Sequence, residues 1–432
     1  MKQEGVWAMG MTMAEKIIAR AAKREQLIPG QFVWADVDTA MMDDLLGPRV
    51  VIAEQIKRLG NTIWDRDKVV IISDHYSPAA NITQAEILKF TRNWAHEYGI
   101  RQYFEGIGPC HQILAEKGFD RPGTLLVGTD SHTCMAGAFG CFGTGIGSTE
   151  MLGVLVSGQI WLRVPESMRF VWQGQLQTGV YAKDLVLKTI CSIGQAGATY
   201  KVMEFAGSCI ERLSVDDRMT IANMAVEAGA KTGIMAPDEK VFSYLDAIGA
   251  DKGTPVYSDA DAKYCYSAEF DAAVLTPQIA LPNEVDKVVS VTDAAGETIH
   301  QAYLGSCTNG RYQDLQEAAK VLRGRKVCDS VRMIVSPASH SIYNRAMRDG
   351  ILQVLSDAGA MIVAPGCGAC LGLHSGILAS HERAISSTNR NFVGRMGHKD
   401  AEIFLGSPAS VAAAAIEGCI ADPRNYLQGV LV

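Results

Sequence analysis

The sequence predicts an α/β protein whose mostly parallel sheets are covered by helices in three-layer α/β/α units around a central cleft. Three observations lead to this class. Short apolar runs alternate with helical patterns along the whole chain. Apolar residues make up 48% and charged residues 20% of the 432, a balance that can bury large cores. Polar loops follow several of the apolar runs, as they do where parallel strands end.

The apolar runs predict strands, and apolar residues that repeat with helical spacing predict helices. In chain order, we expect strands at 68–73, 124–128, 168–174, 300–305, 331–336 and 360–366. We expect helices at 12–23, 83–99, 183–194, 311–324 and 337–359. Two stretches without a clear strand or helix pattern, one after "LRVPES" and one within "LTPQIALPNEVDKV", predict domain boundaries. They divide the chain into three predicted α/β domains, 1–166, 167–284 and 285–432.

Charge and hydropathy exclude several classes of protein. The formal net charge of −7, without a basic stripe, argues against binding to nucleic acid. No apolar run reaches the roughly 18 residues that a membrane helix needs, and the first residues lack the apolar core of a signal peptide. The glycines of "GTGIGS" (143–148) follow a polar loop and lack the spacing of a dinucleotide site. Eleven scattered cysteines fit a cytoplasmic protein that keeps its thiols reduced for metal chemistry.

Four polar loops, each placed after a predicted strand, predict a functional cleft. They read "SDH", "GTDSHT", "GSCTNG" and "PGCGAC" along the chain. In α/β proteins, ligands bind outside the carboxyl ends of the strands. We therefore expect these loops, with their Asp, His, Ser and Cys side chains, to converge on one crevice.

The cysteines in two of these loops predict a metal site. Cys367 and Cys370 form a C-x-x-C pair between glycines, and Cys307 is the best third partner because it also follows a strand. Three hypotheses stay open on spacing alone. They are a structural zinc site completed by His374, an electron-transfer cluster with a fourth cysteine, and a cubane whose open iron acts as a Lewis acid.

The motifs "GTDSHT", "GSCTNGR", "PGCGACLG" and "TNRNFVGRMG" occur in the order and spacing of the aconitase superfamily, which the chain resembles. It is most similar to the separate large subunits of the 3-isopropylmalate dehydratase and homoaconitase branch, nearly from end to end. The resemblance implies a hydro-lyase that reversibly removes water from a small hydroxy di- or tricarboxylic acid. It also implies one [4Fe–4S] cluster on Cys307, Cys367 and Cys370, with one iron that lacks a protein ligand.

The resemblance further assigns catalytic roles to seven residues, which are Asp74, His75, His111, Asp130, Ser131, His132 and Glu227. Asp74 and His75 would form a carboxylate–imidazole pair in which His75 protonates the departing hydroxyl. His111 would be a second imidazole near that hydroxyl. Asp130, Ser131 and His132 would surround the iron-bound water and the substrate. Because these three are consecutive, they cannot form a hydrolase triad.

A second group is implied to contact the cluster or the substrate, namely Asn223, Asn389, Arg390 and Arg395. Asn223 and Glu227 lie four residues apart and would share one face of a helix, from which Glu227 would orient His132. Asn389 would face the cluster. Arg390 and Arg395 would bind substrate carboxylates, which a planar guanidinium can hold with two hydrogen bonds.

The resemblance also implies a protein partner. In the family, the catalytic base is a serine on a swivelling domain. We expect that domain on a separate small subunit, in a heterodimer or heterotetramer, because Val432 leaves no room for it in this chain.

The expected substrates are the 2- and 3-isopropylmalate of leucine biosynthesis. Homocitrate or homoaconitate, citraconate, maleate and dimethylmalate stay open, because Asp43 precedes Asp44 where relatives carry Gln, His or Asn. A carboxylate beside a dianionic substrate is repulsive unless it is protonated or paired. The alternative from another class is an iron–sulfur protein for electron transfer or sensing.

Overall fold

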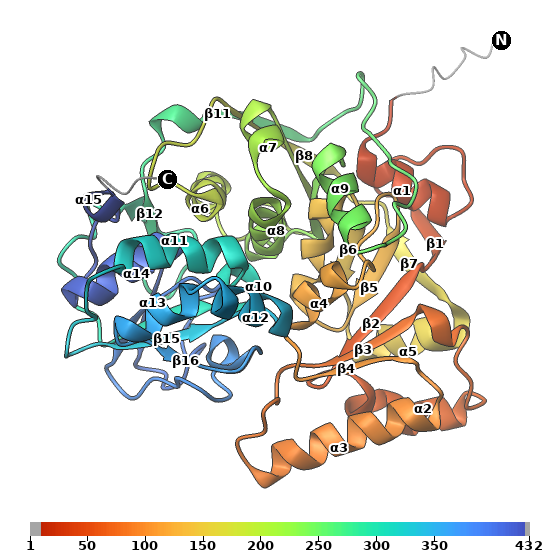
Figure 1. The fold of residues 1–432 in the computed structure, drawn as a ribbon. Helices are drawn as coiled ribbons and strands as arrows, with labels where there is room; N and C mark the ends of the chain where they lie inside the picture. The colour runs from red at the N-terminus through yellow and green to blue at the C-terminus, as the bar shows by residue number, and fades with distance from the viewer. Residues whose placement is uncertain (1–9, 428–432) are drawn as a thin grey trace.

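The computed structural model describes residues 10–427, whose strands form three larger sheets and one two-stranded ribbon (Figure 1). Each larger sheet collects strands from one part of the chain, and helices pack against the sheets. The ribbon pairs β1 (Phe32–Asp36) with β7 (Gln159–Arg163) in antiparallel fashion. The predicted α/β class with mostly parallel sheets is confirmed.

The first sheet has the order β4-β3-β2-β5-β6, and all of its strand pairs are parallel. Its strands are β2 (Thr39–Asp43), β3 (Val69–Ser73), β4 (Gln102–Glu105), β5 (Leu125–Gly128) and β6 (Phe142–Gly145). The strands β2, β3 and β5 are buried along their whole length, as expected for parallel strands covered on both faces.

The first part of the chain also supplies the helices α1 (Met13–Ala21), α2 (Ala53–Arg58), α3 (Ile82–Glu97), α4 (Cys110–Glu116) and α5 (Ser148–Ser157). Helix α1 begins at a capping box, in which Thr12 and Glu15 each accept a hydrogen bond from the backbone of the other. Figure 1 shows α2 and α3 together along one outer edge of the molecule.

The second sheet has the order β10-β9-β8-β11 and is also parallel throughout. Its strands are β8 (Ser167–Gln173), β9 (Val202–Ala206), β10 (Thr232–Met235) and β11 (Tyr266–Asp271). The helices of this part are α6 (Ala182–Ile193), α7 (Ser208–Arg212), α8 (Val215–Met224) and α9 (Glu239–Ala247).

The third sheet has the order β13-β12-β18-β17-β14-β15-β16 and is parallel except for the pairs made by β12. Its strands are β12 (Gln278–Ala280), β13 (Val288–Ser290), β14 (Gln301–Gly305), β15 (Arg332–Ser336), β16 (Met361–Ile362), β17 (Arg383–Ser386) and β18 (Glu402–Leu405). Its helices are α10 (Ser306–Asn309), α11 (Tyr312–Leu322), α12 (His340–Arg348), α13 (Ile351–Asp357), α14 (Pro408–Glu417) and α15 (Arg424–Leu427).

Most predicted elements are present, and two differ. The helix expected over 337–359 is two helices, because Gly350 adopts a left-handed φ of 74° between α12 and α13. The strand expected over 360–366 is reduced to the two residues of β16. The glycines of 143–148 begin inside β6 and lead to α5.

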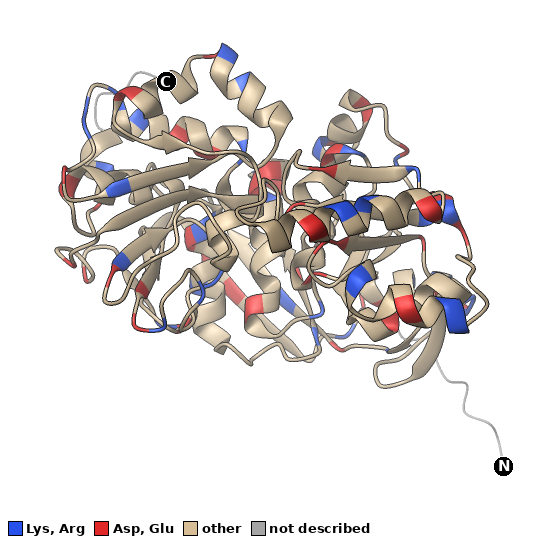
Figure 2. Cartoon of the chain, turned by 90° about the horizontal axis from the view of Figure 1, so that it is seen from below, with Lys and Arg blue, Asp and Glu red and all other residues tan. Residues whose placement is uncertain are grey.

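The predicted domain boundaries stay predictions, since the chain packs continuously across them. Strand β12, for example, precedes residue 284 and pairs with β13 and β18 of the third sheet. None of the helices between residues 10 and 427 combines the length and the apolar character needed to cross a bilayer. Figure 2 shows basic and acidic residues interspersed along the same helices.

Close backbone packing joins the first and second sheets beneath the cleft. The 3₁₀ helix η3 (Ser131–Phe139), which follows β5, lies against β10. At the contact, a Cβ on Gly137 would stand 1.8 Å from the carbonyl oxygen of Gly233. Only a glycine fits there, and this approach fixes the position of the "GTDSHT" loop.

Candidate active site

The predicted loops converge on one cavity of about 510 Å³ at the carboxyl ends of the parallel strands. It is lined by residues that directly follow β3, β5, β6 and β14. Of the fourteen predicted site residues, all line the cavity except Asn223 and Glu227, which contact residues that do. The sequence pattern therefore located the cleft correctly.

His75 is held between two buried carboxylates. Its Nδ1 lies 2.8 Å from Asp74 Oδ1 and 3.3 Å from Asp44 Oδ1, although neither contact has the angle of a good hydrogen bond. Asp44 also accepts the backbone N–H groups of His75 and Tyr76, both at 3.0 Å, and so fixes the loop. Burial alone would lower the pKa of His75, but Asp74, Cys367 and the other carboxylates outweigh it and raise the pKa well above its usual value.

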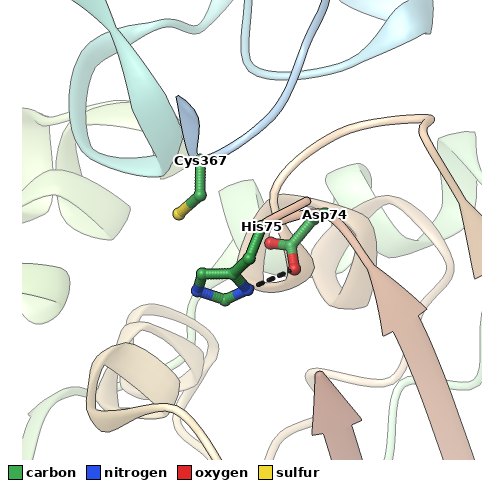
Figure 3. Close-up of side chains that lie close together, drawn as sticks. All are labelled: Asp74, His75 and Cys367. Carbon is green, nitrogen blue, oxygen red and sulfur yellow. Dashed lines mark ion pairs between the residues drawn. The ribbon is translucent and has the colours of Figure 1, made fainter. Parts of the chain in front are cut away.

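The loop of Cys367 reaches this pair directly. Its backbone N–H donates to the carbonyl of Asp74 at 3.0 Å. Figure 3 shows the sulfur of Cys367, carried by a loop of the third sheet, facing the ring of His75 while Asp74 stands on the other side. Ligand atoms of all three residues lie within 4.8 Å of one another. The acid–base pair and the thiol therefore share one end of the cavity.

Asp130 is the centre of a second network, because one carboxylate meets three imidazoles. Its Oδ1 lies 2.8 Å from His111 Nε2 and 3.2 Å from His132 Nδ1, while Oδ2 lies 3.7 Å from His75 Nε2. Burial alone would raise the pKa of Asp130, but the histidines, His111 foremost, hold it well below its usual value. Asp130 is thus an ionised carboxylate that several imidazoles can share.

The network continues from His132 to Glu227 and Arg390. His132 Nε2 lies 2.9 Å from Glu227 Oε1, as the resemblance implied. Arg390 Nε contacts both oxygens of Glu227, at 2.8 and 2.9 Å, and Arg390 Nη2 donates to Ser131 Oγ at 3.0 Å. Arg390 is therefore already paired inside the chain.

Asn223 and Glu227 reach the site from two different elements. Helix α8 ends at Met224, and Glu227 lies in the 3₁₀ turn η4 (Ala225–Ala228), so the expectation of one shared helix is wrong. Asn223 Nδ2 donates to Cys307 Sγ at 3.3 Å. Asn389 Nδ2 donates to Asn223 Oδ1 at 3.1 Å, which links the two asparagines beside the thiols.

The three thiols come from two loops. Cys307 lies in α10, directly after Ser306, whose left-handed φ of 71° is uncommon for a non-glycine residue. Burial raises the pKa of Cys307 to about 12. The neighbouring thiol of Cys367, together with Arg395, instead holds the pKa of Cys370 well below its usual value. A site in which one cysteine is favoured as the thiolate and another is buried is better suited to binding a metal than to holding free thiols.

Two residues of the open hypotheses have different positions from those expected. His374 is engaged on both ring nitrogens, by Ser375 Oγ at 2.9 Å and the His75 carbonyl at 3.2 Å, so it is not free to complete a zinc site. Asp43 is buried behind the cavity and does not line it; burial raises its pKa to about 6. Its Oδ2 has no hydrogen-bond partner among the described residues.

Among the lining residues that the sequence did not single out are a thiol and a cation. Cys110, the first residue of α4, lines the cavity beside His111. Burial, with Asp74 and Asp130, raises the pKa of its thiol well above the usual value. Lys231, just before β10, also lines the cavity. Neither stands in a recognisable motif, so only the fold brings them to the site.

The fold and the cleft define an α/β protein in which three thiols face a network of buried imidazoles and carboxylates in one cavity. The aconitase family (aconitate hydratase) matches residues 15–418, and the chain belongs to that family. Membership makes the chain a hydro-lyase and implies an iron–sulfur cluster. The resemblance read from the motifs is thereby confirmed.

Several relatives match over their full length. The chain is 48% identical, over 97% of its length, to the 3-isopropylmalate dehydratase large subunit 1 of Methanopyrus kandleri. It is 47% identical to the protein of the same name from Pyrococcus furiosus and 45% identical to the 3-isopropylmalate dehydratase large subunit of Halothermothrix orenii, each over 97% of this chain. A crystal structure of Thermococcus kodakaraensis aconitase X covers 90% of this chain and 96% of its own, with a TM-score of 0.50 and 10% identity; it supports the fold alone.

Proposed function

We propose that this chain is the large subunit of a cytoplasmic 3-isopropylmalate dehydratase, which interconverts 2- and 3-isopropylmalate by removing and re-adding water. Full-length similarity to enzymes of that name supports the substrate. The observation that carries the chemistry is a single cavity in which three thiols face an imidazole–carboxylate network. A hydro-lyase of the same family for homoaconitate, maleate, citraconate or dimethylmalate is the alternative substrate assignment.

Cys307, Cys367 and Cys370 would hold a [4Fe–4S] cluster, and the residues around them fit that group. Two N–H groups point at the sulfurs: Asn223 Nδ2 lies 3.3 Å from Cys307 Sγ, and Arg395 Nη2 lies 3.7 Å from Cys370 Sγ. Such donors stabilise cluster thiolates. When bound, the cluster supplies a Lewis acid through one iron that has no ligand from the protein.

His75 is the best placed general acid. Asp74 holds Nδ1, which leaves Nε2 as the nitrogen available to a substrate hydroxyl in the cavity. The carboxylates around the ring favour its protonated form, so it can deliver a proton to a departing hydroxyl and take one back in the reverse direction. Asp44 acts through His75, by fixing the backbone that carries it.

The second network can take up and return a proton, and it holds its imidazoles in place. Asp130 accepts from His111 and His132, and Glu227 holds the far side of His132. Each imidazole therefore has a carboxylate that orients the ring. Ser131, bonded to Arg390, presents its hydroxyl at the same wall of the cavity.

Substrate carboxylates need cations that are not already neutralised. Arg390 is paired with Glu227, so its charge is largely compensated within the chain. Arg395 and Lys231 line the cavity without an ion pair among residues 10–427. We therefore assign the binding of substrate carboxylates mainly to Arg395 and Lys231, and the positioning of Glu227 and Ser131 to Arg390.

A small subunit would complete the enzyme. The relatives carry the words "large subunit" in their names. We propose a swivelling domain on that partner, which brings the catalytic base over the cavity. Large chain purified alone with its cluster intact is expected to show little turnover, and adding the small subunit is expected to restore it. Full activity of the isolated large chain would contradict this part of the proposal.

An electron-transfer protein is the second candidate, because Cys110 brings a fourth thiol to the cavity wall. Four thiolates would close every iron to substrate. The carboxylates of Asp74 and Asp130 beside Cys110 oppose its ionisation, however. That charge environment favours a neutral thiol and hence the hydro-lyase.

Single alanine replacements separate the two functions. With the small subunit co-expressed and purification under anaerobic conditions, we expect Cys110→Ala to keep its iron and its dehydratase activity. We expect loss of both when the replaced residue is Cys307, Cys367 or Cys370. If Cys110→Ala lost its cluster as the others do, the electron-transfer assignment would replace the hydro-lyase. A panel of hydroxy diacids assayed with the unmodified enzyme then decides the substrate.

A further inference from the structure

Two of the three fully buried basic side chains among the described residues have no carboxylate in direct contact. Lys183, Arg218 and Arg311 are each at most 1% exposed. Arg218 pairs with Asp238 at 2.5 Å, as a buried cation normally does. Lys183 and Arg311 form no ion pair within 4 Å between residues 10 and 427, and the carboxylates that act on them from farther away include Asp314, whose pKa burial raises to about 7. A buried charge without a partner in direct contact costs several kcal/mol, so these two need an explanation.

Arg311 clamps the loop of Cys307 through neutral groups. Its guanidinium donates to the carbonyl oxygens of Cys307 and Thr308, the latter at 2.7 Å. It also reaches two other elements, through the carbonyl of Asp216 at 3.2 Å and Gln112 Oε1 at 3.1 Å. The cation therefore stands directly behind one of the three thiols.

Lys183 clamps the opposite wall. From the start of α6, its Nζ donates to the carbonyl oxygens of Ser387, at 2.9 Å, and Thr388. These residues directly precede Asn389, which lines the cavity beside Cys370. Burial lowers the pKa of Lys183 to about 7, and a thiolate at Cys370 is the strongest charge that opposes this effect.

Both cations hydrogen-bond to segments that form the cavity wall around the three thiols. Metal binding requires the thiolate form, so three bound cysteines introduce three negative charges. The cation that lies elsewhere, Arg218, has a carboxylate of its own. The two that hold the cysteine cavity have none in direct contact, which matches a counter-charge supplied by the bound group.

We propose that Lys183 and Arg311 are the buried counter-charges of the iron–sulfur cluster, positioning residues that stabilise its bound form and raise its reduction potential. This inference rests on the cluster of the proposed function. It assigns to both residues an electrostatic role in addition to holding their loops. A positive charge near a cluster favours the reduced form, so its removal makes the cluster harder to reduce.

Lys183→Met is the decisive variant, because it removes the charge and keeps much of the side-chain length. We expect the reconstituted variant to release iron to a chelator about 10- to 100-fold faster than the wild type and to show a more negative midpoint potential. Lys183→Arg and Arg311→Lys keep the charge and are expected to retain a potential close to that of the wild type. Arg218→Met serves as the control that removes a buried cation away from the thiols.

Melting temperatures of the cluster-free proteins separate charge from structure. Without the cluster, Lys183 lacks the thiolate counter-charges, so Lys183→Met is expected to lower the melting temperature of the cluster-free protein less than that of the cluster-loaded protein. Equal destabilisation with and without cluster, together with an unchanged potential and release rate, would overturn the inference and leave only a structural role. A wild type that binds no iron would instead refute the proposed function, so the two failures are distinguishable.

Discussion

The buried pair of Glu227 and Arg390 gives the sharpest single-residue prediction. Arg390 Nε stands 2.8 Å from the nearer oxygen of Glu227, and the side chains are 19% and 7% exposed. At an effective dielectric constant of 20, two unit charges at this distance attract by about 6 kcal/mol before desolvation is counted. Breaking such a pair by removing one partner costs about 3–5 kcal/mol. We expect Glu227→Gln at the low end, because the amide oxygen still accepts one hydrogen bond.

The same substitution also affects catalysis through His132. Glu227 Oε1 lies 2.9 Å from His132 Nε2, so this contact fixes the orientation of the ring. Loss of such an outer partner lowers activity about 10- to 100-fold. The assays are chemical unfolding of the cluster-free chain and kcat of the reconstituted two-subunit enzyme with isopropylmalate.

A matched control is available on the surface. Glu54 pairs with Arg58 at 2.8 Å, but these side chains are 72% and 67% exposed. Glu54→Gln should change the free energy of unfolding by less than about 1 kcal/mol and leave kcat unchanged. If Glu227→Gln behaved like Glu54→Gln in both assays, the argument that Glu227 links Arg390 to His132 would be refuted.

Further predictions concern charge, pH and backbone packing. Lys231→Met should raise KM about 10- to 100-fold with little change in kcat, because a charge-assisted hydrogen bond contributes about 1.5–3 kcal/mol; an unchanged KM would remove Lys231 from the substrate site. Burial raises the pKa of Asp120 to about 8, so the folded chain holds a proton that the unfolded chain loses above about pH 4. The stability that this group contributes therefore falls as the pH rises from about 4 to about 8, by about 1.4 kcal/mol per pH unit between pH 5 and 7. Thermal unfolding of Asp120→Asn should show a dependence of stability on pH that is shallower by that amount. Gly137→Ala should cost at least about 3 kcal/mol, because its Cβ would meet the Gly233 carbonyl at 1.8 Å. Gly153→Ala, exposed in α5 with nothing within 4 Å, should instead gain about 1 kcal/mol in the same unfolding assay.

The sequence was most informative where local chemistry and chain order coincide. Buried parallel strands such as β3 read as apolar runs, and the polar residue after each run marks the edge where ligands bind. Asp74 and Cys367, 293 residues apart in number, could be placed in one cleft on that rule, and the backbone hydrogen bond between them shows how close they lie.

Other features depend on packing that a sequence pattern does not carry. A lysine or arginine in a helical stretch is usually solvated, so Lys183 and Arg311 gave no signal of complete burial. The break between α12 and α13 depends on a left-handed φ at Gly350, and glycine inside a helical pattern is often tolerated. Cys110 escaped notice because its thiol is brought to the cavity by the direction of α4 and by no motif.

The proposed dehydratase chemistry depends on an iron that the protein leaves free for the substrate. Mössbauer spectroscopy of ⁵⁷Fe-reconstituted, anaerobic holoenzyme tests this directly, with spectra recorded before and after addition of isopropylmalate. We predict that the signal of one iron in four changes when substrate is added, while the other three are unaffected. Four irons with substrate-independent signals, or a protein that binds no iron, would contradict the account.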